Sequence, residues 1–225
     1  MNIGQPEFWD KLLKTKTSTE RVYYSERGHK KRILAISDLM ESLSGPSTWK
    51  RILDLGCGVG DFFHYTSQWI KPQSVGIDFC EASIEEATVK YPDHIFFHRD
   101  VRDVDFISRL AGKKTFFQFV VANGLFMIQP TFPTTESCVR YISNILWNKK
   151  LKHCTHHFIA NFLWDRYIPS GGHEGLKQDS MDNLVTLAFR NNLSCCIYAG
   201  YLPHEFIAVF ARSYKPMFDK GVKWI

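Results

Sequence analysis

The 225-residue sequence lacks the features that mark several special classes of protein. No uninterrupted apolar run approaches the roughly 20 residues that a membrane-spanning helix needs. The 6 cysteines are scattered without a Cys-x-x-Cys pair, which favours free buried thiols over a disulfide framework or a zinc site. The first ten residues carry acidic and amide side chains where a signal peptide has a basic start and an apolar stretch. These absences predict a cytoplasmic protein without a membrane segment.

What the sequence does contain is the composition of an ordinary globular domain. Its residues are 44% hydrophobic, 23% charged and 15% aromatic, which excludes disorder and low complexity. The length allows one large domain or two very small ones. The net charge of +5 is unevenly spread, because residues 51–110 hold 6 Lys/Arg against 10 Asp/Glu and the flanking segments together carry +9. An acidic central region therefore lies between basic flanks.

From residue 51 onward, short apolar runs alternate with longer stretches of helical period, which is typical of a parallel sheet with crossover helices. The last two runs are separated by too few residues for a parallel crossover and are predicted to form an antiparallel hairpin. The sequence thus predicts an α/β fold with a seven-stranded, doubly wound, mostly parallel sheet that ends in this hairpin. The predicted strands are Arg51–Leu55, Ser74–Asp78, Ile95–His98, Phe117–Ala122, His157–Phe162, Cys195–Tyr198 and Phe206–Ala211, and the predicted helices between them are Gly60–Trp69, Cys80–Lys90, Val104–Leu110, Thr134–Trp147 and Ser180–Asn191.

Two further helical patterns precede the sheet. Residues Glu7–Leu13 look helical, and Gly28–Leu43 has an apolar face. The fifty N-terminal residues are too few for a domain of their own. We therefore predict a helical lid or substrate cap over residues 1–50, a core over 51–213 and a tail over 214–225. Substrate choice would come from the lid and from the loop Trp164–Glu174.

The first strand of the core runs into a glycine-rich turn, which reads Asp-Leu-Gly-Cys-Gly-Val-Gly-Asp over residues 54–61. Glycine allows tight turns and a close approach of ligand to backbone, and this turn follows the strand at the sheet edge where α/β folds bind ligands. A dinucleotide fingerprint is excluded because Asp61 takes the place of its third glycine, and a P-loop because Gly-Lys-Ser/Thr is missing. The acids Asp54 and Asp61 suit a cationic ligand better than a pyrophosphate.

This strand and turn resemble the first motif of the class I S-adenosylmethionine-dependent methyltransferases, D-x-G-x-G-x-G. Asp78 ends the second strand about 20 residues later, like the family's acid that accepts hydrogen bonds from both ribose hydroxyls. Asp100 would accept from the adenine amino group, and Asn123 would flank the methionine moiety. The resemblance implies S-adenosylmethionine as cofactor, S-adenosylhomocysteine as product, and cofactor binding by Asp54, Gly56, Cys57, Gly58, Gly60, Asp78, Phe79, Asp100, Val101, Asn123 and Arg27.

Other interpretations of these acids stay open. Asp54 and Asp61 could cap the helix after the glycine turn, Asp78 could cap the helix that begins near Cys80, and Asp100 could be an ordinary turn residue. No metal site is predicted, because strand alternation would split the nearby imidazoles and thiol between opposite faces. That group comprises His153, Cys154, His156 and His157.

Methyl transfer from a sulfonium is an in-line displacement, so the protein mainly aims the acceptor and excludes water. A base is needed only where the accepting atom arrives protonated. We predict catalytic roles for Tyr24, on a segment that closes over the cofactor in many relatives, and for Asp165 or His173 as general base.

The resulting prediction is an N- or O-methyltransferase of a small metabolite or natural-product intermediate. It would act as a monomer or homodimer, with no membrane and no nucleic-acid partner. Two alternatives remain open: methylation of a macromolecule such as tRNA or protein, and a non-catalytic partner subunit with the same fold.

Overall fold

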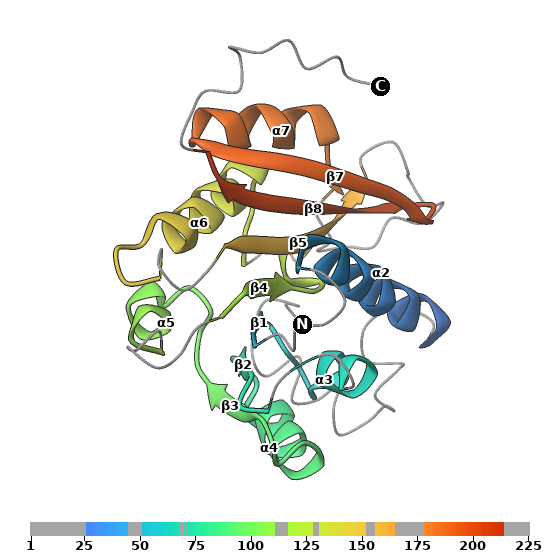
Figure 1. Ribbon diagram of the computed structural model, residues 1–225, viewed down its shortest axis with the longest axis vertical. Helices are drawn as coiled ribbons and strands as arrows, with labels where there is room; N and C mark the ends of the chain where they lie inside the picture. The colour runs from blue at the N-terminus through green and yellow to red at the C-terminus, as the bar shows by residue number, and fades with distance from the viewer. Residues whose placement is uncertain are drawn as a thin grey trace.

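The computed structural model describes residues 26–44, 51–67, 70, 72–110, 117–127, 131–151, 156–164 and 178–213. A sheet runs through their centre with its main strands in the order β3-β2-β1-β4-β5-β8-β7 (Figure 1). The first five strands pair in parallel, whereas β8 is antiparallel to both β5 and β7. The main strands are β1 (Ile52–Leu55), β2 (Val75–Asp78), β3 (Ile95–His98), β4 (Phe119–Ala122), β5 (His157–Trp164), β7 (Leu193–Leu202) and β8 (Glu205–Arg212).

This arrangement confirms the predicted doubly wound sheet and its terminal hairpin. The hairpin is longer than predicted, since Leu202 pairs directly with Glu205 and only two residues form the turn. An additional strand of two residues, β6 (Gln178–Asp179), pairs with the end of β5. It was not predicted, because two residues are too short to show the alternation on which strand prediction depends.

Helices cover both faces of the sheet (Figure 1). On one face lie α2, α3 and α4, and on the other lie α5, α6 and α7. The helix predicted for Gly60–Trp69 is described only over six residues, and the predicted helix Glu7–Leu13 lies outside the described residues. The helices are α2 (Glu26–Ser44), α3 (Asp61–Thr66), α4 (Glu81–Lys90), α5 (Val104–Leu110), α6 (Thr135–Trp147) and α7 (Met181–Arg190), with a 3-10 turn, η2 (Leu125–Met127), after β4.

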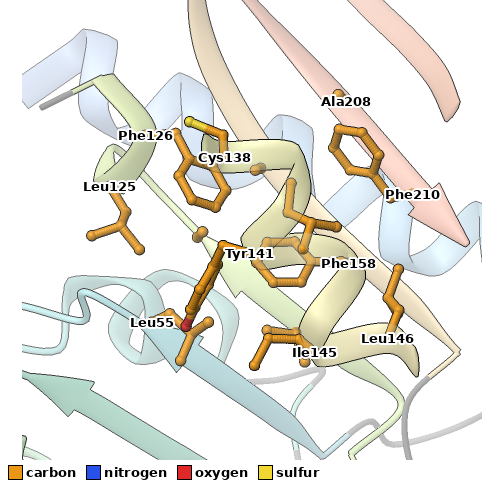
Figure 2. Packing of buried hydrophobic residues seen from close by; sticks show 14 of the residues in the cluster. Leu55, Leu125, Phe126, Cys138, Tyr141, Ile145, Leu146, Phe158, Ala208 and Phe210 are labelled. Atoms are coloured by element: carbon orange, nitrogen blue, oxygen red, sulfur yellow. The ribbon is translucent and has the colours of Figure 1, made fainter. Parts of the chain in front are cut away.

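The core follows from strand alternation, which sends successive side chains to opposite faces. Phe158 of β5 is fully buried on the α6 side, where Tyr141 and Ile145 lie around it (Figure 2). The next residue, Ile159, packs on the opposite face with Ile36 of α2. Because α2 shares this second core, the N-terminal helix is packed on the sheet. The role of residues 1–50 as a lid stays a prediction.

The helix α2 contains most of the apolar face that its sequence pattern indicates. Ile33, Ile36 and Met40 are buried, whereas Leu43 in the last turn stays 42% exposed. Its buried surface also contains a charged residue that the apolar pattern did not reveal, Arg32, which is 1% exposed. The side of α2 that faces the sheet is therefore not purely apolar.

The cysteine prediction is met only in part. Cys57, Cys80 and Cys138 are buried free thiols, whereas Cys196 is exposed because it lies on the edge strand β7. Across the described portion of the chain, no helix has the length and apolarity required to cross a membrane.

Candidate active site

The candidate site lies where the strand order reverses, between β1 and β4. In open α/β sheets the crevice at such a point, outside the carboxyl ends of the strands, is where ligands bind. The glycine loop, residues 56–60, follows β1 there, and the segment that we call the β4 loop, residues 123–127, follows β4. A Cβ on Gly56 would lie 3.3 Å from Cδ1 of Leu125, so the two loops are in contact. They form adjoining walls of the site.

The glycine loop needs its glycines for two different reasons. Gly58 has a φ of +53°, and a Cβ there would meet no atom within 4 Å, so open space lies beside its backbone. Gly60 has a φ of +83°, and its Cβ would collide with the ring of Tyr91 at 2.8 Å. Gly58 therefore leaves room for a ligand, whereas Gly60 lets the start of α3 pack against Tyr91.

Asp78 holds the glycine loop from the neighbouring strand. Its Oδ2 accepts a hydrogen bond from the Gly58 amide at 2.9 Å, and its Oδ1 accepts one from the Cys80 amide at 2.9 Å. Burial raises the pKa of Asp78, and these backbone hydrogen bonds offset only part of the rise. Each carboxylate oxygen keeps a further lone pair. Asp78 thus does bond the N-cap residue of α4, and it retains capacity for two hydroxyl donors.

Asp54 is the most unusual acid of the site. It is 1% exposed, and its Oδ1 has no hydrogen-bond partner among the described residues. Burial, followed by the charge of Asp78, raises its pKa to about 8. The interpretation of Asp54 as a helix cap is wrong, because Gly60 is the N-cap residue of α3 and no side chain caps it. A buried carboxyl with one unpartnered oxygen and a strongly raised pKa is a functional-site feature.

Asp61 lies at the first position of α3 rather than at its cap. Its Oδ2 is 3.4 Å from Nε2 of His29 on α2. Burial alone would raise the pKa of Asp61, but the nearby His29, with smaller contributions from Lys90 and His64, outweighs it and lowers the pKa. Asp61 therefore connects the end of the glycine loop to α2.

Asp100 occupies a turn in which its partner is close in sequence. Its carboxylate accepts hydrogen bonds from the backbone amide and the guanidinium of Arg102. Burial raises the pKa of Asp100, but Arg102 more than compensates and the net pKa is lowered. This geometry is that of the turn acid considered as the alternative. Contact of Asp100 with an adenine amino group stays a prediction.

The remaining predicted cofactor residues are spread around this region. Cys57 and Val101 are buried, and the Val101 carbonyl accepts the hydroxyl of Tyr141 at 2.6 Å. Phe79 and Asn123 are half-buried, and Oδ1 of Asn123 has no hydrogen-bond partner within the described part of the chain.

Arg27 is exposed on α2, and its contact with the cofactor stays a prediction. The predicted catalytic residues Tyr24, Asp165 and His173 lie outside the described residues, so their roles stay predictions. In the portion that is described, no group of three or more His, Cys, Asp or Glu side chains could hold a metal ion.

The structure adds a buried polar network that was not predicted. Glu205, 0% exposed at the start of β8, receives Nε and Nη2 of Arg32 at 2.7 and 2.5 Å. The hydroxyl of Tyr201 and Nδ2 of Asn161 also donate to it, at 3.0 and 3.2 Å. Burial alone would raise the pKa of Glu205, but these donors, with Arg32 foremost, lower it. Glu205 is therefore an ionised and well-partnered carboxylate.

The network reaches the candidate site through Asn161. Its Oδ1 accepts the amide of Gly124 at 2.6 Å, and its Nδ2 also contacts Sδ of Met127 at 3.5 Å. The sequence did hold a signal for Asn161, a polar residue within the apolar strand predicted at His157–Phe162, whereas Glu205 lies just before the strand predicted at Phe206–Ala211. What it did not show is that Arg32, 173 positions before Glu205, is their partner.

The sheet order and reversed terminal hairpin are those of the class I methyltransferase fold, and solved structures share it. They include magnesium protoporphyrin IX methyltransferase from Synechocystis PCC 6803 with bound S-adenosylmethionine, at 16% identity and a TM-score of 0.58, covering 94% of this chain and 93% of that one. CalS10, an amino pentose methyltransferase from Micromonospora echinaspora, has 12% identity and a TM-score of 0.61, covering 83% and 94%. DesVI from Streptomyces venezuelae has 11% identity and a TM-score of 0.61, covering 93% and 99%.

Sequence comparison identifies the domain. Residues 52–148 match the family described as a methyltransferase domain. This segment contains β1 to β4, the glycine loop and the β4 loop. No curated protein matches the chain. The described residues thus have the class I methyltransferase fold, and residues 52–148 match a methyltransferase domain.

Proposed function

We propose that this chain is a methyltransferase that binds S-adenosylmethionine between the glycine loop and the β4 loop and transfers its methyl group in line to a nitrogen or oxygen of a small molecule. The observation that carries the proposal is the pair of buried carboxylates, Asp54 and Asp78, beside the open space at Gly58. Such a pair suits a ligand that combines positive charge with hydroxyl groups.

The residues of the site fit this cofactor. Oδ1 of Asp54 is a buried acceptor without a partner, and a nearby cation would favour its charged form. Asp78 keeps lone pairs for two hydroxyl donors while its backbone contacts hold it in place. When bound, the cofactor supplies an electrophilic methyl group on a positively charged sulfur.

The chain's own part in the reaction is then to orient the two reactants and to exclude water. Asp78 would orient the ribose hydroxyls, and Asp54 would balance positive charge. Leu125, Phe126 and Met127 of the β4 loop are all buried, so this wall of the site is largely apolar. Holding two reactants in a fixed geometry is the main contribution to a displacement of this kind.

A small acceptor is supported by the proteins of similar fold. Two of them are named for such acceptors, an amino pentose and magnesium protoporphyrin IX. Tyr24, Asp165 and His173 are the proposed acceptor-side residues, with Asp165 or His173 as the base if the accepting atom is protonated.

The proposal is tested in two stages. Calorimetry with S-adenosylmethionine at up to millimolar concentration should show binding to the purified chain. Transfer of a radiolabelled methyl group is then measured with amino pentoses, magnesium porphyrins, bulk tRNA and protein as acceptors. Labelling of a small molecule alone supports the proposal. Absence of cofactor binding would contradict it and favour a non-catalytic partner, and labelling of tRNA or protein alone would overturn the small-molecule part.

A further inference from the structure

The buried network around Glu205 connects three parts of the fold that are far apart in the sequence. Arg32 comes from α2, Asn161 from β5, and Glu205 from the start of β8. Strand alternation places Asn161 with Ile159, and Glu205 with Ile207, on the sheet face that α2 covers. The charged and amide groups therefore lie between α2 and the sheet, at the carboxyl end of β5.

The Glu205 carboxylate has a definite set of neighbours. Oε2 accepts from Arg32, Asn161 and Tyr201, while Oε1 accepts from Arg32 and lies 3.8 Å from the His204 imidazole. With Nδ2 directed to Glu205, the Asn161 amide has its Oδ1 directed to the Gly124 backbone amide. A planar amide cannot move one end without the other. The position of Glu205 is thus transmitted to Gly124.

Gly124 belongs to the β4 loop, which is the second wall of the proposed site. Its φ of +88° favours glycine, and a Cβ there would meet nothing within 4 Å, so its backbone borders open space. The following residue, Leu125, contacts the position of a Cβ on Gly56 in the first wall. The spacing between the two walls therefore depends on where the β4 loop is held.

We propose that Glu205 is a positioning residue of the methyltransferase site: through Asn161 it fixes the β4 loop, and through Arg32 it fixes that loop relative to α2. This inference rests on the proposed function only for its consequence in cofactor binding. The positioning itself can be measured in the protein without a ligand.

The measurement uses a single spectroscopic reporter. Asn123-Gly124 is the only Asn-Gly pair in the sequence. Labelling asparagine with carbonyl 13C and glycine with 15N therefore selects one amide, that of Gly124, in a carbonyl-filtered NMR spectrum. Glu205→Gln should shift this resonance and speed its hydrogen exchange by about tenfold, the loss expected for one well-formed hydrogen bond. The dissociation constant of S-adenosylhomocysteine should rise about tenfold as well, since the wall has moved.

Two further variants make the result decisive. Tyr201→Phe removes another hydrogen bond to the same carboxylate oxygen but leaves the Asn161 bonds to Glu205 and Gly124 in place, so the Gly124 exchange should stay within about twofold of the wild type. Arg32→Met combined with Glu205→Leu removes both charges at once and should fold where Glu205→Gln alone does not, because it leaves no buried charge unbalanced. Its Gly124 amide should also exchange about tenfold faster.

Protection of Gly124 that persists in a folded Glu205 variant would overturn the proposal. So would an equal effect of Tyr201→Phe, because the network would then act through general stability. If the wild type fails to bind S-adenosylhomocysteine, the proposed function is wrong, whereas the exchange data still decide whether Glu205 positions the β4 loop.

Discussion

Two regions of the same sheet contain buried carboxyl groups whose pKa values are shifted in opposite directions. At the ends of β1 and β2, burial raises the pKa of both Asp54 and Asp78, the charge of Asp78 raises that of Asp54 further, and Asp54 has an oxygen without a partner among the described residues. At the start of β8, Glu205 is just as buried but has the Arg32 guanidinium and two further side-chain donors, and its pKa is lowered.

The difference shows how burial can serve binding in one place and structure in another. A buried ion pair whose hydrogen bonds are all formed needs no further partner. Removal of one of its two residues leaves the other charge buried and unbalanced. A pair of buried acids with raised pKa values, by contrast, can be stabilised in its charged form by a cationic ligand. The arrangement at Glu205 stabilises the fold, and the arrangement at Asp54 and Asp78 would be stabilised further by a bound cation.

The largest expected effect is on the free energy of unfolding and concerns Glu205. Glu205→Gln should lower the free energy of unfolding by about 3–5 kcal/mol, because it takes the negative charge away from the buried Arg32. Urea unfolding gives the value directly. Glu136→Gln is the matched control, since its ion pair with Arg140 is exposed, and it should cost less than about 1 kcal/mol. Equal losses for the two variants would remove the distinction between the two carboxylate centres.

On the binding side, Asp78→Ala should weaken the binding of S-adenosylhomocysteine by about 1–3 kcal/mol, the scale of leaving buried hydroxyls unpaired. Isothermal titration calorimetry provides the measurement. Asp105→Ala, an exposed acid on α5, serves as the control and should leave the affinity unchanged. If Asp78→Ala binds as tightly as the wild type, Asp78 serves only to order Gly58 and Cys80.

The two centres should also respond to pH with opposite signs. Because the pKa of Asp54 is raised from 3.8 to about 8, the folded state keeps a proton that the unfolded state loses, and the free energy of unfolding falls as pH rises through this window. The slope from this group is at most about 1.4 kcal/mol per pH unit. The lowered pKa of Glu205 gives stability that is lost only as pH falls below its ordinary range.

Urea unfolding between about pH 5 and pH 7.5 separates the two contributions when the wild type is compared with Asp54→Asn. The variant should lack the decline in stability toward higher pH, and it should be at least as stable as the wild type near neutrality. Parallel pH profiles for the two proteins would show that Asp54 does not carry the proton. Adding S-adenosylmethionine should reduce the wild-type decline, because a cation favours the charged carboxylate.

The smallest expected effect concerns the link between the glycine loop and α2. Asp61→Asn removes a partly exposed ion pair with His29 and should cost about 0.2–1 kcal/mol in unfolding free energy. Thermal unfolding at low and high salt measures it, and the difference from the wild type should shrink as salt is added. A loss as large as that of Glu205→Gln would mean that α2 is held mainly at Asp61 and not at Glu205.

Much of the fold could be predicted because the information is local. The run Ile52–Leu55 and the glycines after it identify a strand and a tight turn within ten residues, and the short link before Phe206 permits only a hairpin. The ends of the strands follow less directly from the local sequence, since β7 continues past Tyr198 only because β8 is there to pair with it. Strand β6 depends on β5 in the same way.

The residues of the candidate site show the same distinction between local information and tertiary contacts. Asp54, Gly58 and Asp78 follow directly from a motif with fixed spacing, and the structure brings all three together. The bond from Asp100 to Arg102 was one of two interpretations that the residues allowed. The buried Arg32 was missed because an arginine on an amphipathic helix ordinarily points to solvent.

By itself, the sequence determined the fold class, since apolar periodicity, turn glycines and spaced acids are set by residues close together in the chain. Only the tertiary structure decided how each buried acid behaves. The pKa of a carboxylate depends on the charges and donors that surround it in space, and those of Glu205 come from α2, β5 and β7. A buried carboxyl group therefore stabilises the fold at Glu205 and is a proposed ligand contact at Asp54.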